Sequence, residues 1–185
     1  MSLVAERINV PGQSFLTSLT YRNVDKVWFR AIKATPAIKN YIAESGSEEW
    51  TAKIIKEPVV KEWTFVLPVD LDYNSHSVQL PAPALEVGEY ILLVASHPEF
   101  KNTGEGLAYG ITHVSNIGFT ERNIAGGMVE FVVFNRSTGE PLAGVEAQSV
   151  ERYYDYDKRK YLTRNGTKYI TDKDGFFILK NEKDY

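Results

Sequence analysis

Apolar and polar residues alternate along much of the chain, in short segments separated by glycine, proline, asparagine and aspartate. Residues 27–32 are an example: Val27 and Phe29 fall on one face of an extended segment, and Trp28 and Arg30 on the other. A period of two is typical of β-strands that bury one face. The pattern therefore predicts an all-β fold.

Four segments before residue 96 indicate how such strands are arranged. Segments 14–21 and 27–32 are joined by the polar residues 22–25, which predicts a β-hairpin. Residues 63–69 form a further predicted strand, with its aromatic and leucine side chains on one face. Residues 90–95 are apolar at every position, which predicts a central strand buried on both faces.

Residues 36–56 break the alternation and form the predicted minor helical insertion. Ile38 and Ile42 have helical spacing, and so do Trp50 and Ile54. Ser47, followed by two glutamates, resembles the residue that caps the start of a helix. We expect one or two short helices inserted in a β domain.

A glycine-rich stretch predicts the domain boundary. Residues 107–117 are expected to be the last strand of the first domain, and residues 118–127 contain three glycines. The predicted domains are residues 10–118 and residues 119–185, each an Ig-like β-sandwich.

The second predicted domain has few strands. Residues 128–134 and 144–150 are strands, and residues 168–170 and 176–179 are expected to pair as a hairpin around the turn at 171–175. A typical sandwich has about seven strands. The domain is therefore either truncated or a small partial sheet, and we expect the chain to be a piece of a longer protein.

Composition and charge narrow the function classes. The 185 residues include 11 Tyr, 9 Phe and 3 Trp, enough bulky side chains to build a core, and the net charge is −3. A mildly acidic chain has no general electrostatic attraction to nucleic acid. The absence of cysteine excludes thiolate metal sites, disulfides and a cysteine nucleophile. No apolar run is long enough for membrane insertion.

Motifs for catalysis, cofactors or metals are not evident. The three histidines, His76, His97 and His113, have neither metal-ligand spacing nor a serine nucleophile motif beside them. Residues 171–175 resemble the start of a calcium loop, but apolar residues 176–179 follow where further ligands would be needed, which favours a turn. We predict a non-enzyme with no catalytic, metal-binding or cofactor-binding residue.

One segment, residues 152–161, is unusually rich in tyrosine and basic residues. It is either two strands with amphipathic side chains on the wet face, or a contact surface for protein or glycan, because tyrosine and arginine dominate binding hot spots. Stacking of single-stranded nucleic acid is a third possibility, against which its two acids and the net charge argue. The candidate interaction residues are Arg152, Tyr153, Tyr154, Tyr156, Arg159 and Tyr161.

Four stretches of the sequence carry a resemblance to a known family. They are residues 80–95, residues 113–122 (HVSNIGFTER), residues 128–147 (MVEFVVFNRSTGEPLAGVEA) and residues 171–177 (TDKDGFF). In this order they resemble bacterial alpha-2-macroglobulin family proteins, which string together macroglobulin-like β-sandwich domains. The Cys-Gly-Glu-Gln thioester of that family is absent from this chain.

The resemblance implies a scaffold piece from the N-terminal part of a large envelope protein that entraps proteases. Neighbouring domains of the same parent chain, and proteases, would be its partners, in the periplasm or at the outer membrane or cell surface. Two other functions stay open: a cell-surface module that binds glycan or protein, and an accessory domain of a larger enzyme.

Overall fold

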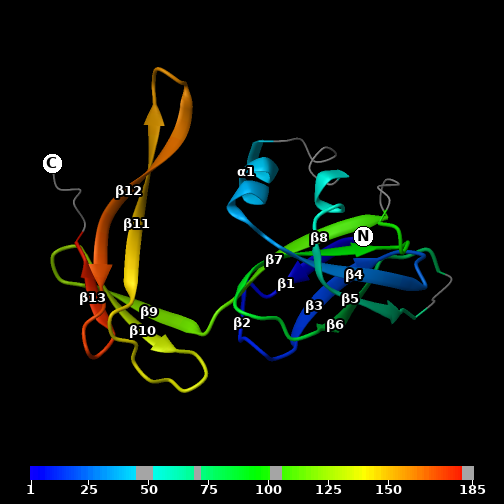
Figure 1. The fold of residues 1–185 in the computed structure, drawn as a ribbon, viewed down its shortest axis with the longest axis horizontal. Helices are drawn as coiled ribbons and strands as arrows, with labels where there is room; N and C mark the ends of the chain where they lie inside the picture. The colour runs from blue at the N-terminus through cyan, green and yellow to red at the C-terminus, as the bar shows by residue number, and fades with distance from the viewer. Residues whose placement is uncertain (45–51, 69–71, 101–105, 181–185) are drawn as a thin grey trace. The chain divides into compact units, whose positions relative to one another are not determined.

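The computed structural model describes residues 1–44, 52–68, 72–100 and 106–180 (Figure 1). The chain divides into two compact units, Met1–Ser115 (unit 1) and Asn116–Tyr185 (unit 2). Strands form most of both units, so the predicted all-β class with a minor helical insertion is confirmed. None of the helices described is long and apolar enough to span a membrane.

Unit 1 is a sandwich of two sheets. The first sheet has the order β1-β3-β6, with bounds Ser2–Ala5, Phe15–Tyr21 and His76–Ala82. The second has the order β2-β8-β7-β4-β5, with bounds Ile8–Asn9, Leu107–Val114, Gly88–Ala95, Lys26–Lys33 and Val59–Val66. Neighbouring strands are antiparallel except β2 and β8, which are parallel.

The core of unit 1 lies between the inner faces of its two sheets. Leu19 of the first sheet packs in one cluster with Phe29 and Leu92 of the second, and all three are fully buried. Phe29 stacks on Trp63, with ring centroids 5.2 Å apart. Strand β7 is buried along both faces in the middle of its sheet, which confirms the prediction from its unbroken apolar run.

Unit 1 has a second hydrophobic cluster besides its main core. Helix α1 (Pro36–Glu44) and the helical residues 52–54 contribute side chains to it. Ile38 and Ile54 are buried there with Ile32 of β4 and Ile91 of β7, on the face of the sheet opposite the main core. Thr35 caps α1, because its Oγ1 accepts a hydrogen bond from Ile38 N at 3.3 Å. The predicted cap at Ser47, and Trp50 with its predicted helical spacing to Ile54, lie outside the described residues.

The predicted hairpin of segments 14–21 and 27–32 is wrong. Strand β3 pairs with β1 and β6, whereas β4 pairs with β5 and β7 in the opposite sheet. Residues 22–25 therefore carry the chain from one sheet to the other, and both inward faces meet across the core. Alternation shows which face of a strand is apolar, and it is the same for a hairpin and for such a crossing.

The glycine-rich residues 118–127, predicted to mark the domain boundary, form a strand and a turn within unit 2. Strand β8 ends at Val114, and residues Ile117–Ile124 form β9, which pairs antiparallel with β10 (Met128–Asn135). Two of the three glycines, Gly126 and Gly127, form the tight turn between these strands. The two units divide between Ser115 and Asn116.

Unit 2 consists of a three-stranded and a two-stranded sheet. The first has the order β13-β10-β9, where β13 is Phe176–Leu179. The second pairs β11 (Glu146–Asp155) with β12 (Lys160–Ile170). The predicted hairpin between residues 168–170 and 176–179 is wrong, because β13 pairs with β10 and the turn at 171–175 crosses between the sheets.

Candidate interaction site

A long β-ribbon carries the candidate interaction residues. Strands β11 and β12 pair from Glu146 opposite Ile170 to Asp155 opposite Lys160, and the turn at 156–159 closes the ribbon (Figure 1). Asp155 supports this turn, because its Oδ1 accepts a hydrogen bond from Lys158 N at 2.9 Å. All six predicted residues therefore lie at the turn end of one ribbon.

Most of these residues form one cluster on a single face. The ring of Tyr154 contacts Tyr156 and Tyr161 edge to face, with centroids 5.1 and 5.2 Å apart. The guanidinium carbon of Arg152 lies 4.2 Å from the centroid of Tyr161. Tyr156 is 84% exposed and Tyr161 60% exposed, so the cluster presents aromatic surface to solvent. We call these four residues the ribbon cluster.

The other two predicted residues are placed differently. Tyr153 alternates with its neighbours and lies on the opposite face of β11, where Arg164 is 5.6 Å from its ring centroid. Glu151 accepts a hydrogen bond from Arg164 Nε at 2.7 Å, and this bond raises the pKa of the arginine. Arg159 occupies the turn with a positive φ of 50°. The sequence analysis placed Tyr153 and Tyr154 in one group, but successive side chains of a strand point to opposite faces of the sheet.

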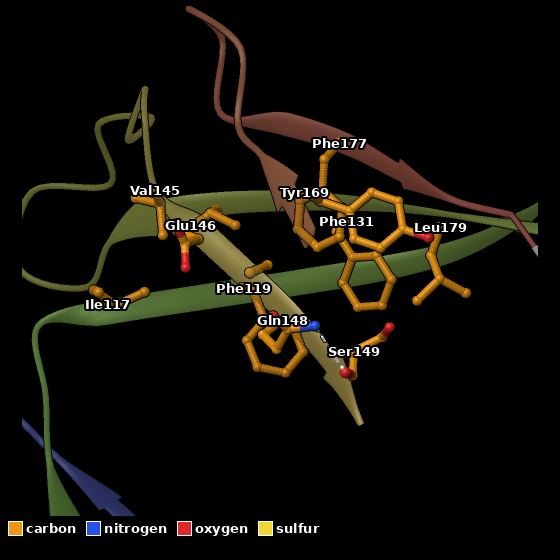
Figure 2. A pocket seen from close by; sticks show the side chains of 12 residues that line it. Ile117, Phe119, Phe131, Val145, Glu146, Gln148, Ser149, Tyr169, Phe177 and Leu179 are labelled. Carbon is orange, nitrogen blue, oxygen red and sulfur yellow. Dashed lines mark hydrogen bonds between the residues drawn. The ribbon is translucent and has the colours of Figure 1, made fainter. Parts of the chain in front are cut away.

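An apolar groove between the two sheets of unit 2 is the second feature, and the sequence did not reveal it. Its volume is about 380 Å³ (Figure 2). Its floor is a row of rings: Phe131 stacks on Phe177 with centroids 4.8 Å apart, and Tyr169 stacks on Phe177 at 5.4 Å. Phe119 lies 6.0 Å from Phe131. The sequence pattern of the separate strands does not reveal that these rings come together, because they lie on four different strands.

The turn at 171–175 is a structural element of unit 2. Oδ1 of Asp172 accepts hydrogen bonds from Asp174 N and Phe176 N, each at 2.9 Å. Thr171 is buried, accepts a hydrogen bond from Val145 N at 2.8 Å and donates one to the Leu142 carbonyl at 2.6 Å. The motif thus fastens the start of β11 to the end of β12, in line with its interpretation as a turn.

The histidines lie at separate places in unit 1. His76 Nε2 is 2.9 Å from Asp72 Oδ1, and His113 Nδ1 is 3.5 Å from Glu89 Oε1. The hydrogen bond from His76, with those from Asn74, lowers the pKa of Asp72 to about 2. Among the residues described, no three His, Asp or Glu side chains gather in a group that could hold a metal ion.

Comparison with known proteins identifies the fold. No protein-family model matches the sequence. No curated protein matches it either. Native alpha-2-macroglobulin from Escherichia coli, in a crystal structure spanning domains MG0-NIE-MG1, aligns with 98% of this chain at a TM-score of 0.60 and 17% identity. A mutant of Salmonella alpha-2-macroglobulin aligns with 98% of the chain at a TM-score of 0.50 and 14% identity.

The chain spans 58% of the length of the first of these structures and 10% of the second. At such low identity the likeness concerns the fold. The resemblance indicated by the sequence motifs is confirmed at that level: the chain has the fold of a segment of bacterial alpha-2-macroglobulin.

Proposed function

We propose that the chain is a non-catalytic structural and interaction module of a large bacterial alpha-2-macroglobulin-like envelope protein that entraps proteases. The observation that carries the proposal is the alignment of 98% of the chain with a multidomain alpha-2-macroglobulin segment. The dispersed histidines and the apolar lining of the groove also support a module without catalysis, because catalysis needs converging titratable groups.

In this proposal the chain contributes rigid scaffold to the wall that encloses a protease. The burial of β7 from Tyr90 to Ala95 and the packing on both faces of its sheet suit such a role, since a wall must hold its shape when a protease pushes against it. Its partners would be neighbouring domains of the parent chain and the trapped protease. The parent protein would lie in the periplasm or at the outer membrane or cell surface.

The proposal is tested on the parent protein with and without residues 1–185. We expect the intact protein to protect a large protein substrate from a protease while a small peptide substrate is still cleaved. The deletion variant should lose this selective protection. Equal protection by both proteins would contradict the proposed scaffold role.

The non-catalytic part of the proposal has its own test. We expect the chain to show no turnover in peptidase, esterase and glycosidase assays. Turnover that is abolished by a single substitution of an aspartate or histidine, such as Asp72→Asn or His113→Gln, would overturn it.

A second candidate function, binding of glycan or protein at a cell surface, is favoured by the ribbon cluster. Exposed tyrosines and an arginine on one face supply area and polar contacts at little entropic cost. On a glycan array, Tyr156→Ala should then abolish binding, whereas Tyr153→Ala on the opposite face should retain it. Ile170→Ala, an exposed position at the other end of β12, is the matched control.

A further inference from the structure

The register of the ribbon places two tyrosines directly opposite each other. Tyr154 of β11 pairs with Tyr161 of β12, and the neighbouring pair of Asp155 and Lys160 borders the turn. Opposite side chains of antiparallel strands lie on the same face, with Cβ atoms about 4.5–5.5 Å apart. The two ring centroids are 5.2 Å apart, and the ring planes meet at 70°. Backbone pairing therefore holds the two phenol rings in contact.

Both rings are open to solvent and can turn. Tyr154 is 39% exposed and Tyr161 is 60% exposed. Exposed side chains change rotamer within picoseconds to nanoseconds, so the edge-to-face arrangement does not prevent the two ring edges from meeting. A small oxidant in solution can reach either ring. Contact, exposure and fast rotation together are the conditions under which two phenols couple.

The amino-acid composition gives such coupling a structural consequence. The chain has no cysteine, so no thiol competes with the phenols for an oxidant, and no disulfide can join β11 to β12. Its two methionines, Met1 and Met128, lie outside the ribbon. In the described residues β11 and β12 form a sheet of two strands, and a two-stranded ribbon is marginally stable by itself. A covalent bond at its turn end would hold the strands together.

We propose that Tyr154 and Tyr161 form a cross-linking site, at which a one-electron oxidant of the class of a peroxidase intermediate joins them as dityrosine and fastens β11 to β12. Each tyrosine gives one electron to the oxidant and its phenolic proton to solvent, which leaves two phenoxyl radicals. The radicals join through a carbon–carbon bond between their ortho carbons. Each ortho carbon then loses its proton, and a proton returns to each phenolic oxygen. In total the pair loses two electrons and two protons, and the oxidant is reduced twice.

Two neighbouring tyrosines show why this pair is favoured. Tyr156 has its ring centroid 5.1 Å from that of Tyr154, but it lies in the turn and has no ladder partner among the described residues. Tyr161 is held on both sides, because the pairs of residues 153 with 162 and 155 with 160 flank it. Tyr153 lies on the opposite face of β11, so its phenol is directed away from Tyr161. The cross-strand link is therefore the expected product.

The probe oxidant is a ruthenium(III) bipyridyl complex, generated by light and persulfate in a solution of the complete chain at several low protein concentrations. Trypsin then cuts between the two tyrosines, after Lys158, Arg159 and Lys160. We expect peptides 153–158 and 161–164 to stay joined, at their summed mass less two hydrogen atoms, and fragmentation to place the bond on Tyr154. The proposal is overturned by the absence of joined peptides, by a bond on another tyrosine, or by a yield that rises with protein concentration, as coupling between chains requires.

Two variants locate the effect, and each keeps the aromatic ring. Tyr161→Phe lacks the phenol hydroxyl and should lower the yield of joined peptides at least about tenfold. Tyr153→Phe changes the opposite face of β11 and should alter the yield less than about twofold. Amide protection in β12 verifies that both variants are folded. Equal yields from the two variants would contradict the assignment of the link to Tyr161.

Hydrogen exchange tests the structural effect of the link. In the oxidised chain, backbone amides at the turn end of β11 should exchange at least about threefold more slowly than in oxidised Tyr161→Phe, because a cross-link removes conformations in which the strands separate. Equal exchange in the two oxidised proteins would show that the link does not fasten β11 to β12.

Discussion

Asn9 and Thr112 are 103 positions apart in the sequence, and a buried hydrogen bond of 2.7 Å joins Asn9 Nδ2 to Thr112 Oγ1. Thr112 in turn donates to the Glu6 carbonyl at 2.7 Å. These two bonds fasten the short strand β2 to β8 at the parallel edge of the sheet. Asn9 Oδ1 is buried and accepts no hydrogen bond from any residue in the described part of the chain.

Thr112→Val tests the importance of this link. Valine keeps the shape but removes both the donor to Glu6 and the acceptor for Asn9, so unfolding should become easier by about 1–3 kcal/mol. Tryptophan fluorescence during urea denaturation measures the change, because all three tryptophans lie in the segment of unit 1 from Trp28 to Trp63. Thr20→Val removes a surface hydroxyl contact to Ser77 and should cost less than about 0.5 kcal/mol. Equal costs would show that the buried link does not contribute.

Gly175 and Gly139 provide a matched test of turn geometry in unit 2. Both have positive φ, 78° and 76°, so alanine should cost about 1–2 kcal/mol at either. A Cβ at Gly175 would also overlap the carbonyl oxygen of Val133, whereas one at Gly139 meets nothing within 4 Å. Gly175→Ala should therefore destabilise unit 2 by about 1–3 kcal/mol more than Gly139→Ala. Hydrogen exchange of β10 amides measures both, and equal effects would contradict the overlap.

The Asp72–His76 contact predicts a pH dependence of unit 1. The pKa of Asp72 is lowered from 3.8 to about 2, first by the hydrogen bond from His76 and then by those from Asn74. A lowered pKa means that the carboxylate stabilises the folded state above pH 3.8, and that this contribution is lost as the pH falls towards 2. Asp72→Asn should flatten the dependence of the urea midpoint on pH in this window.

The control for that measurement is Glu86→Gln, which removes an exposed carboxylate from the same unit. The contribution of Asp72 to the pH dependence is the difference between the two variants in how the urea midpoint changes with pH. An Asp72→Asn profile as steep as that of Glu86→Gln would show that the contact does not stabilise unit 1.

Limited trypsin digestion tests the ribbon. We expect the first cuts after Lys158, Arg159 or Lys160, because these residues lie in or beside its exposed terminal turn. Arg30 in the interior strand β4 should resist cleavage. Residues 120–124 belong to β9 and pair with β10, so they should also resist early cleavage. Mass spectrometry of the first fragments decides, and initial cleavage after Arg122 would contradict the structure-based expectation.

The sequence predicted individual strands better than their partners. Leu92 and Leu93 sit in an unbroken apolar run, and the run alone indicated a strand buried on both faces. The sequence predicts hairpins at 22–25 and 171–175, where the structure has crossings between two sheets. A polar turn between two alternating segments gives the same sequence pattern for a hairpin and for a crossing. In the ribbon, composition found Tyr153 and Tyr154 together, whereas the pleat places them on opposite faces.

By itself, the sequence determined where several strands lie, β4, β7 and β10 among them, and which residues of unit 2 gather tyrosine and arginine. These properties are local, because the side-chain period of a strand is set by its own backbone. The tertiary structure alone decided that β3 and β4 belong to different sheets and that Phe119, 58% exposed, lines a groove between the two sheets of unit 2. Strand pairing is made by backbone groups common to every residue, so the partner of a strand leaves little trace in its own sequence.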